Sequence, residues 1–573
     1  MRLRVPSFLF LLALATACTP ATPVSVLPTT WRHTGQAPVA TGDRAMVVSS
    51  HPIASTVGRD VLRAGGNAVD AAVAVGFALA VVHPVAGNIG GGGFMVMRMR
   101  DGSSYALDYR EVAPTGATRD MFLDAAGNVT DKSRLGHLAS GVPGAVAGML
   151  EAHRRFGRLP LAAVLDPAIA LARDGFVLDR HRAGSLRGAA RRLGQFPASA
   201  RQFLVNNGTE GPPDGYLLRQ PDLARTLEAI RDHGRDGFYR GWVADSIAAE
   251  MERGGGLITR EDLARYQARW REPIRIDYRG WTVWSMPPAS SGGATLAMLL
   301  NVMEGFGRLP EFGTPELMHL EAEAMRRAFT DRNRFLADPD FEQVPLARLV
   351  SKEHARTLRA DIDPRRATPT PPFDPAIVEG NNTTHYSVVD AEGNAVSTTT
   401  TINFGYGSFV TVSGAGFLLN NEMDDFAAAP GKPNGFGLVQ GEVNAIEPGK
   451  RMLSAMTPSV VVDPSGQLRM VVGSPGGPTI ITQVYHVISN VIDHGMTLAD
   501  AVAAPRTHHQ ALPDQLRVES PGGFTDAALD ALRAMGHSID TGGGWGDFQA
   551  IERRGGKWVG VSDPRAGGGG AGW

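Results

Sequence analysis

The chain has 573 residues, of which 43% are hydrophobic and 20% are charged. This length and composition are typical of a globular protein that buries a sizeable core. The formal net charge of -2 leaves no overall basic field, which excludes nucleic acid and acidic lipid as partners held by global charge. The 69 glycines and 38 prolines favour a sheet-rich body with many turns over a helical bundle.

The N-terminus has the pattern of an export signal. Arg2 and Arg4 form a charged start, and an apolar run follows from Phe8 to Ala15. This run is too short to cross a bilayer as a helix, so residues 1–17 are interpreted as a cleaved signal peptide. The sequence therefore predicts an exported protein.

Cys18 is the only cysteine, and it stands where a bacterial lipoprotein signal places its acylated residue. Two interpretations stay open. Acylation of Cys18 would anchor the protein to a membrane, whereas ordinary cleavage near Ala17 would release it into the periplasm, and Ala15 makes the lipobox imperfect. No intrachain disulfide is possible in either case. Residues 18–45, rich in Pro and Thr, are predicted to form a flexible tether.

The first part of the body alternates strands and helices. We expect a strand at 46–50, a helix at 55–63, and a wholly apolar, buried helix at 68–82. The glycine run at 90–93 precedes a strand at 94–97 and lacks a Gly-Lys-Ser/Thr ending, so it indicates tight backbone packing and not a phosphate loop.

A break divides the chain near its middle. Residues 141 to about 360 have a mainly helical pattern, and residues 361–382 contain five prolines, which no regular element tolerates. Beyond this linker the pattern is strand-rich, with an expected hairpin at 384–390 and 395–402. Further strands are expected at 459–462 and 468–472, a helix at 479–494, and a flexible glycine-rich tail at 567–572. This order predicts an α+β layered sandwich.

Five motifs occur in one order along the chain. They are Gly-Asn-Ala-Val-Asp-Ala-Ala-Val-Ala (66–74), Leu-Asp-Tyr-Arg-Glu-Val-Ala-Pro (107–114), Thr-Thr-His-Tyr-Ser-Val-Val-Asp (383–390), Leu-Asn-Asn-Glu-Met-Asp-Asp-Phe (419–426) and Gly-Ser-Pro-Gly-Gly (473–477). This set closely resembles the γ-glutamyltranspeptidase family from about Met46 to Arg565. Five ordered motifs are far more specific than any one of them.

The resemblance implies an N-terminal-nucleophile hydrolase fold, a four-layer αββα sandwich. It also implies that the precursor cuts itself between Asn382 and Thr383. The large subunit would then be residues 46–382, and the small catalytic subunit would be residues 383–573.

The chemistry of threonine fits this maturation. A hydroxyl beside a peptide carbonyl can attack it, exchange amide for ester, and leave water to finish the cut. The freed α-amino group of Thr383 has a reference pKa of roughly 7.7–8.0. It can therefore accept the proton of its own hydroxyl, so the mechanism requires no cofactor and no metal.

The resemblance also assigns binding residues. Arg110 matches the cation that holds the substrate α-carboxylate, although an ion pair with the neighbouring Glu111 is the alternative. Ser454 matches a second carboxylate contact. Glu422 and Asp425 match the acceptors of the α-ammonium.

Four further residues match supporting positions. Asn403 corresponds to a substrate-contacting asparagine, and Thr401 to a threonine that supports the nucleophile. Gly476 and Gly477 can bring backbone N–H groups close to a developing oxyanion because no side chain blocks the approach.

Two positions depart from the family pattern. Ala455 replaces a second serine, and Phe436, in a loop at 430–439, replaces a tyrosine that would latch the loop through its hydroxyl. Both changes reduce polarity and put strict γ-glutamyl specificity in doubt. The pair His508-His509 lacks further ligands at metal spacing, so a packed or surface pair is expected there.

These features predict acyl transfer from glutathione or another γ-glutamyl donor to water, an amino acid or a peptide. An alternative within the same family is a cephalosporin acylase acting on glutaryl side chains, which lack the α-ammonium. A surface lipoprotein that keeps the fold without catalysis is a third interpretation, and the intact nucleophile, glycines and arginine argue against it.

Overall fold

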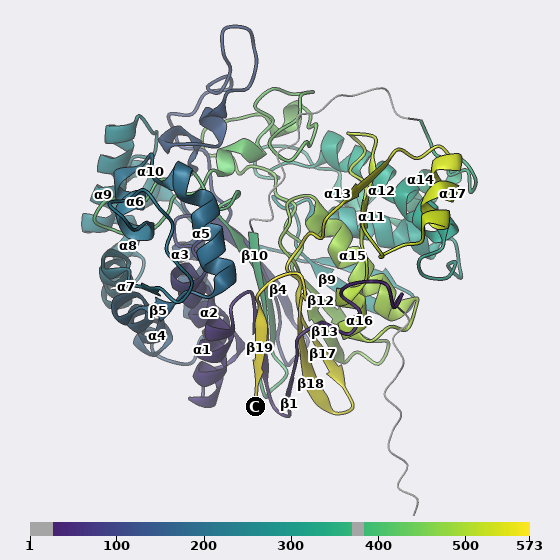
Figure 1. Cartoon of the computed structure of the whole chain (residues 1–573), viewed down its shortest axis with the longest axis horizontal. Helices are drawn as coiled ribbons and strands as arrows, with labels where there is room; N and C mark the ends of the chain where they lie inside the picture. Colours follow the sequence, from purple (N-terminus) through teal and green to yellow (C-terminus); the bar gives the residue numbers. More distant parts are fainter. Residues whose placement is uncertain (1–26, 370–382) are drawn as a thin grey trace, which may run out of the picture.

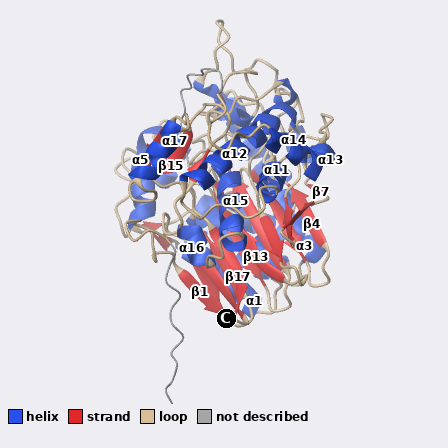
Figure 2. Cartoon of the chain, turned by 90° about the vertical axis from the view of Figure 1, so that its right-hand side faces the viewer, coloured by secondary structure: helices blue, strands red, loops and turns tan. Residues whose placement is uncertain are grey.

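Two large sheets lie face to face at the centre of the molecule, with helices on both outer sides (Figure 1; Figure 2). The computed structural model describes residues 27–369 and 383–573. Within these residues no helix is both long and apolar enough to cross a membrane. The layers are helix, sheet, sheet and helix, as the sequence predicts for the four-layer αββα sandwich.

Each central sheet has seven strands, all paired antiparallel. The first sheet runs in the order β1 (Val39–Gly42), β18 (Lys557–Ser562), β17 (Gln549–Arg554), β13 (Leu468–Val472), β12 (Ser459–Val462), β9 (Trp281–Ser285) and β8 (Ile274–Tyr278). The second runs in the order β19 (Gly569–Gly572), β2 (Met46–Ser49), β10 (Thr383–Val389), β11 (Ala395–Thr401), β3 (Gly92–Arg98), β4 (Ser104–Asp108) and β7 (Arg269–Arg271).

The helices fall into two groups, one on each side of the sheets in Figure 1. The group beside the second sheet is α1 (Pro52–Arg63), α2 (Ala68–Val82), α3 (Ala145–Phe156), α4 (Leu161–Asp174), α5 (Arg180–Leu193), α6 (Pro197–Phe203), α7 (Pro221–His233), α8 (Asp236–Tyr239), α9 (Gly241–Gly254) and α10 (Arg260–Arg265). The other group is α11 (Gly292–Glu304), α12 (Pro315–Phe335), α13 (Leu346–Leu349), α14 (Lys352–Ala360), α15 (Thr479–Ile492), α16 (Leu498–Ala503) and α17 (Asp526–Ala534). Small sheets pair β5 (Phe176–Val177) with β6 (Leu217–Leu218), and β14 (Thr507–His508) with β15 (Leu516–Glu519) and β16 (Ile539–Gly542).

The hairpin of β10 and β11 is the centre of the second sheet. The two strands pair over their full length, from Thr383 opposite Thr401 to Val389 opposite Ala395. Successive side chains point to opposite faces, so β10 contributes to two interiors. Ser387 donates to the carbonyl oxygen of Gln549 in the facing sheet (3.0 Å), whereas Tyr386 belongs to the core that contains α2.

Helix α2 is buried along its whole length, as its apolar sequence predicts. Its start is fixed by a capping box in which Asn67 accepts from the backbone N–H of Asp70 (3.0 Å) and the Asp70 carboxylate accepts from the N–H of Asn67 (2.9 Å). The Asp390 carboxylate, just after β10, accepts from the N–H of Ala68 (3.0 Å). The cap thus joins the helix to the central hairpin.

The two chain ends are more ordered than the sequence predicts. Within the predicted tether, Trp31 is buried and its Nε1 donates to the carbonyl oxygen of Ala503 (2.7 Å), and β1 pairs with β18. The glycine-rich tail forms β19 against β2. The prediction of flexibility was wrong for these residues because strand pairing uses backbone groups, which composition does not reveal.

Strands interrupt the mainly helical pattern that was predicted for residues 141–360. Strands β7, β8 and β9 lie there. In β8 the buried residues Ile274, Ile276 and Tyr278 alternate with exposed ones. These strands are only three to five residues long, which is too short for their alternation to stand out within a mainly helical stretch of sequence.

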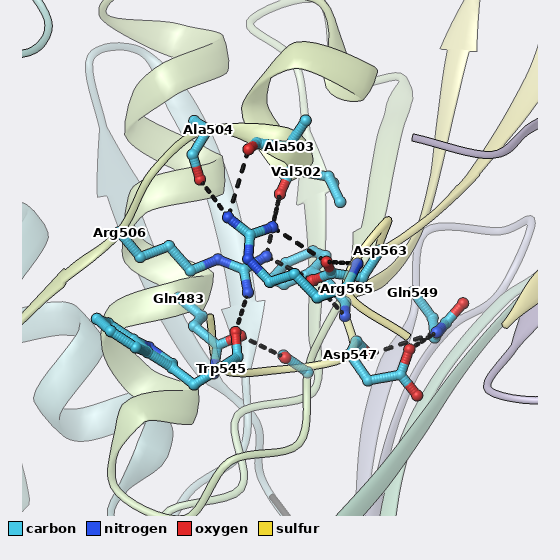
Figure 3. Close-up of polar contacts among 12 residues, drawn as sticks. Gln483, Val502, Ala503, Ala504, Arg506, Trp545, Asp547, Gln549, Asp563 and Arg565 are labelled. Atoms are coloured by element: carbon cyan, nitrogen blue, oxygen red, sulfur yellow. Dashed lines mark hydrogen bonds and ion pairs between the residues drawn. The ribbon is translucent and has the colours of Figure 1, made fainter. Parts of the chain in front are cut away.

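A buried ion-pair network fastens the C-terminal region (Figure 3). Arg506 contacts Asp563 (2.5 Å), and Arg565 contacts Glu519 (2.6 Å) and Asp563 (3.0 Å). The guanidinium of Arg565 also lies over the ring of Trp31, 5.6 Å from its centroid. These contacts connect β15, the end of β18 and the N-terminal segment.

Replacing Asp563 with Ala should strongly destabilise the fold because Arg506 would keep a buried charge without its partner. Loss of one member of a buried pair costs about 3–5 kcal/mol. Denaturant unfolding of this variant should show that loss. The control is Arg100→Gln, which removes an exposed contact to Glu392 and should leave the free energy of unfolding almost unchanged. Equal effects of the two variants would contradict the role of the network.

Candidate active site

Thr383 is the first residue of β10, and its neighbour across the hairpin is Thr401. The Thr383 hydroxyl donates to the Thr401 Oγ1 at 3.4 Å, and the backbone N–H of Asn403 donates to the same oxygen at 2.8 Å. Only 8% of Thr383 is exposed. The strand pairing therefore holds one threonine hydroxyl against another at the end of the central sheet.

A narrow cavity surrounds Thr383 and brings together most of the site residues that the sequence indicates. Its lining includes Arg110, Thr383, Thr401, Asn403, Glu422, Asp425, Ser454 and Gly477. Gly476 is not part of this lining, although it precedes Gly477 directly. Asn382 and Cys18 lie outside the described residues.

The glycine run between α2 and β3 makes room for the site. A side chain on Gly91 would lie 2.1 Å from the carbonyl oxygen of Thr401, and one on Gly92 would lie 2.6 Å from a carboxylate oxygen of Glu111. No residue but glycine fits such distances. The run therefore serves close backbone packing, as its sequence context predicts.

Arg110 follows β4 and lies in the cavity wall with its guanidinium fully enclosed. Its Nη1 is 2.7 Å from Glu422 and 3.7 Å from Glu111, and its Nη2 contacts Asp425. The Arg110 Nε donates to the carbonyl oxygen of Met452 (3.2 Å). Both interpretations of Arg110 thus have a structural basis, since it lines the cavity and also lies near Glu111.

Two buried carboxylates, Glu111 and Glu422, and the partly buried Asp425 surround this one guanidinium. Burial raises the pKa of Glu111 to about 8, because the interior disfavours the charged form more than Arg110 favours it. Burial also raises the pKa of Glu422 and Asp425, with Arg110 opposing the shift. Glu111 therefore holds a proton at neutral pH.

Asn403 and Ser454 are fixed by backbone contacts. Asn403 has a φ of 72°, which is uncommon for a residue with a side chain, and its amide donates to the carbonyl oxygen of Asn421 (3.0 Å). The Ser454 hydroxyl oxygen accepts from the N–H of Met456 (3.1 Å). Both side chains are held in place at the cavity wall.

Comparison with known proteins identifies the family. A sequence model of gamma-glutamyltranspeptidase matches residues 54–573. A glutathione hydrolase proenzyme of Escherichia coli K12 is 47% identical over 529 residues, covering 91% of this chain and 90% of that protein. The chain belongs to the gamma-glutamyltranspeptidase family.

Two further proteins that are similar to this chain are acylases. The acylase ACY 1 proenzyme of a Pseudomonas species (strain V22) is 39% identical over 511 residues, covering 87% of this chain and 88% of that protein. The crystal structure of a cephalosporin acylase from Bacillus halodurans superposes with a TM-score of 0.82 at 31% identity, covering 93% of this chain and 97% of that one. The fold is therefore the one that the resemblance implies.

The two departures from the family pattern both lie in the cavity wall. Ala455 lines it, and so does Phe436 from the loop at 430–439. The Phe436 ring stacks on Phe404, with 4.5 Å between centroids and 15° between planes. A side chain on Gly477 would meet the Phe436 ring at 2.7 Å, so the loop packs directly on the glycine pair. Phe436 has no hydroxyl that could donate a hydrogen bond, so stacking on Phe404 holds its ring in place.

Sequence reasoning missed Arg332 and Asn421. Arg332, on α12, lines the cavity, and its Nη1 donates to Gln440 (3.0 Å); burial lowers its pKa to about 10. The Asn421 Oδ1 accepts from the N–H of Phe404 (3.1 Å). Asn421 lies within the motif at 419–426, which was a signal that could have identified it. The sequence of α12 around Arg332 has no feature that distinguishes it from an arginine at the surface.

His508 and His509 are a packed pair. Both are buried, His508 contacts the Thr482 hydroxyl (3.0 Å), and His509 contacts Asp514 (3.1 Å). Burial lowers the pKa of His508 to about 3, so it is neutral at physiological pH. Of the two arrangements expected from the sequence, packed or at the surface, the structure shows the packed one.

Replacing Arg110 with Met should destabilise the protein more at high pH than at low pH. Because burial raises the pKa of its carboxylates, the folded cluster binds more protons than the unfolded chain once pH exceeds the ordinary carboxylate pKa of about 4. The free energy of unfolding therefore falls as pH rises from there through about 8, the pKa of Glu111. Without Arg110, ionised Glu111, Glu422 and Asp425 lose their counter-charge. The loss of melting temperature should therefore be larger at about pH 9 than at about pH 6.

The control for this variant is Arg119→Gln, which breaks a more exposed ion pair with Glu442. Its melting temperature should track the wild type at both pH values. A loss in the Arg110 variant that does not depend on pH would contradict the description of the cluster.

Proposed function

We propose that this protein is a self-processed γ-glutamyltransferase and glutathione hydrolase, with Thr383 as nucleophile. The observation that carries the proposal is the cavity that places a strand-initial threonine beside Arg110 and its two carboxylate partners, Glu422 and Asp425. Its glutathione hydrolase relatives are 46–48% identical and match most of the chain.

Maturation uses the same hydroxyl as catalysis. The Thr383 Oγ1 attacks the carbonyl carbon of Asn382, the C–N bond breaks, and the proton of the hydroxyl passes to the departing nitrogen. Water then hydrolyses the ester, leaving a carboxylate on Asn382 and a free α-amino group on Thr383. The precursor thereby becomes a large subunit that ends at Asn382 and a small subunit that begins at Thr383, and the two stay paired.

The charged cluster fits the zwitterionic end of a γ-glutamyl group. The α-carboxylate binds the guanidinium of Arg110, with the Ser454 hydroxyl as a second donor. The α-ammonium binds Glu422 and Asp425, and its charge offsets the excess of carboxylates. Asn403, which lies just after strand β11, orients this end of the γ-glutamyl group.

Catalysis then proceeds through an ester. The neutral α-amino group of Thr383 takes the hydroxyl proton, the oxygen attacks the γ-carbonyl carbon, and the protonated amine returns the proton to the departing nitrogen. Backbone N–H groups at Gly476 and Gly477 stabilise the oxyanion, and Thr401 orients the hydroxyl. Water or an amine then attacks the ester carbonyl and frees Thr383.

Export completes the proposal. Residues 1–17 direct the precursor across the membrane, and the mature protein is periplasmic or held by a lipid on Cys18. Glutathione, other γ-glutamyl compounds, and amino-acid or peptide acceptors are its small-molecule partners.

A glutaryl or cephalosporin acylase is the second candidate. Ala455 and Phe436 favour it by making the cavity less polar, and so does the similarity to the acylase ACY 1 proenzyme. The retained Glu422 and Asp425 favour the γ-glutamyl substrate, since a glutaryl group has no ammonium to bind them. The acylase relatives are also less similar than the glutathione hydrolases.

Mass spectrometry tests the maturation step. Purified wild type should contain two chains, the smaller one beginning at Thr383. Thr383→Ala should stay one chain and release no product from a γ-glutamyl anilide, because both the cut and the reaction need the hydroxyl. Thr384→Ala is the matched control and should still be cut at the same bond. An uncut, active wild type would overturn the mechanism.

Glu422→Gln tests how the donor is recognised. Loss of a charged acceptor should raise KM for a γ-glutamyl anilide about tenfold or more and leave KM for a glutaryl anilide nearly unchanged. In the wild type, ammonium binding needs ionised Glu422 and Asp425, whose pKa burial raises, so KM for the γ-glutamyl donor should fall as pH rises.

The control variant is Glu442→Gln, an exposed residue outside the cavity, which should leave both KM values unchanged. A wild-type preference for the glutaryl anilide would establish the acylase instead. A KM that rises equally for both anilides in Glu422→Gln would show that this carboxylate does not bind the ammonium.

A further inference from the structure

A second cavity, of about 680 Å³, lies beside the catalytic one. This volume is in the range of sites for small organic ligands. Its wall combines side chains of α5 with Arg134 and the loop at 404–409. It contains none of the residues so far given a catalytic or donor-binding role.

The two cavities share a wall. Phe404 lines the second cavity and stacks on Phe436, which lines the catalytic one. Asn421 also lines the second cavity, and its carbonyl oxygen accepts from Asn403, a residue of the catalytic cavity. The stacked rings of Phe404 and Phe436 therefore separate a ligand in the second cavity from the catalytic cavity.

The loop that forms this wall is held in a strained conformation. Tyr406 and Phe409 have φ values of 66° and 64°, like Asn403 at the start of the loop. The Tyr406 hydroxyl contacts the hydroxyl of Ser185 on α5 at 2.8 Å. Residues with side chains keep such backbone angles only where surrounding contacts enforce them, and they gather at ligand sites.

The charge of the second cavity is positive. Arg134, Arg191 and Arg192 line it, against the single carboxylate of Asp131, which pairs with Arg134 (2.5 Å). Within the described part of the chain no carboxylate lies within ion-pair distance of Arg191 or Arg192. Arg192 instead lies over the ring of Phe409, 5.5 Å from its centroid. Two guanidinium groups are thus available to an anionic ligand.

We propose that this cavity binds the amine partner of the transfer, a short peptide whose C-terminal carboxylate contacts Arg191 and Arg192. The proposal rests on the function given above and adds its second substrate site. The leaving dipeptide of glutathione carries the same carboxylate and would occupy the same place. Apolar neighbours such as Val85, Leu135 and the Phe404 ring would contact the peptide side chains.

The separation of the cavities favours a peptide over a single amino acid. The carboxylate of the acceptor contacts Arg191 and Arg192, while its amine must reach the ester beyond the stacked rings of Phe404 and Phe436. Each residue added to the acceptor extends its reach by about 3.3–3.6 Å. At the ester, the amine nitrogen bonds to the carbonyl carbon, the bond to the Thr383 oxygen breaks, and the proton of the amine passes through the Thr383 α-amino group to that oxygen.

A double variant, Arg191→Gln with Arg192→Gln, tests the site with purified two-chain enzyme. Transfer from a γ-glutamyl anilide to glycylglycine should show a KM for glycylglycine raised about tenfold, because a charged contact is lost. Hydrolysis of the anilide, whose leaving group has no carboxylate, should change less than about twofold. Wild type should prefer glycylglycine to glycylglycinamide, and the double variant should lose this preference.

Arg187→Gln is the control, since Arg187 is on the same helix but contacts Asp214 (3.0 Å) outside the cavity. It should match the wild type with both acceptors. An unchanged KM for glycylglycine in the double variant, or an equal rise for glycylglycinamide, would overturn the assignment of the cavity alone. A wild type that does not hydrolyse the γ-glutamyl anilide would instead overturn the proposed function.

Discussion

The pairing of β10 with β11 is the constraint on which the site depends. It fixes Thr383 opposite Thr401 at the end of a central strand. Strand β3 pairs with β11 over its full length, and β2 pairs with β10 from Tyr386 to Val389. In the proposed mechanism the Thr383 hydroxyl first cuts its own chain and then attacks substrates, and both steps require it to be held in one position. In this mechanism the sheet already holds Thr383 in position before its peptide bond is cut. The amine that the cut releases therefore stays close to the hydroxyl that it activates.

The charges around the nucleophile divide the chemistry between two cavities. The catalytic cavity is lined by two guanidinium groups and two carboxylates, a mixed set that suits the ammonium and carboxylate at the free end of a γ-glutamyl group. The neighbouring cavity has more cation than carboxylate and fits the anionic end of a peptide. The stacked rings of Phe404 and Phe436 lie between them. In our proposal the donor and the acceptor therefore approach the same ester from two sides.

Much of this arrangement could be predicted from the sequence. The apolar run of α2, the central hairpin and the ordered motifs depend on local patterns, and the structure places them as expected. Strands β1 and β19 could not be predicted because their stability comes from backbone pairing with distant strands. Arg332 and the cavity with Arg191 depend on tertiary contacts between helices and loops far apart in sequence, which no local pattern encodes.

The most direct test of the central claim is to trap the acyl-enzyme. Wild type mixed with a γ-glutamyl anilide and quenched in acid should yield, on peptide mapping, a γ-glutamyl group attached to Thr383 at the start of the small chain. Hydroxylamine should cleave this bond, because it attacks the carbonyl carbon of an ester and releases the Thr383 hydroxyl, whereas an amide resists it. A γ-glutamyl group on any other residue, or product formation through direct attack of water with no covalent adduct, would contradict the account.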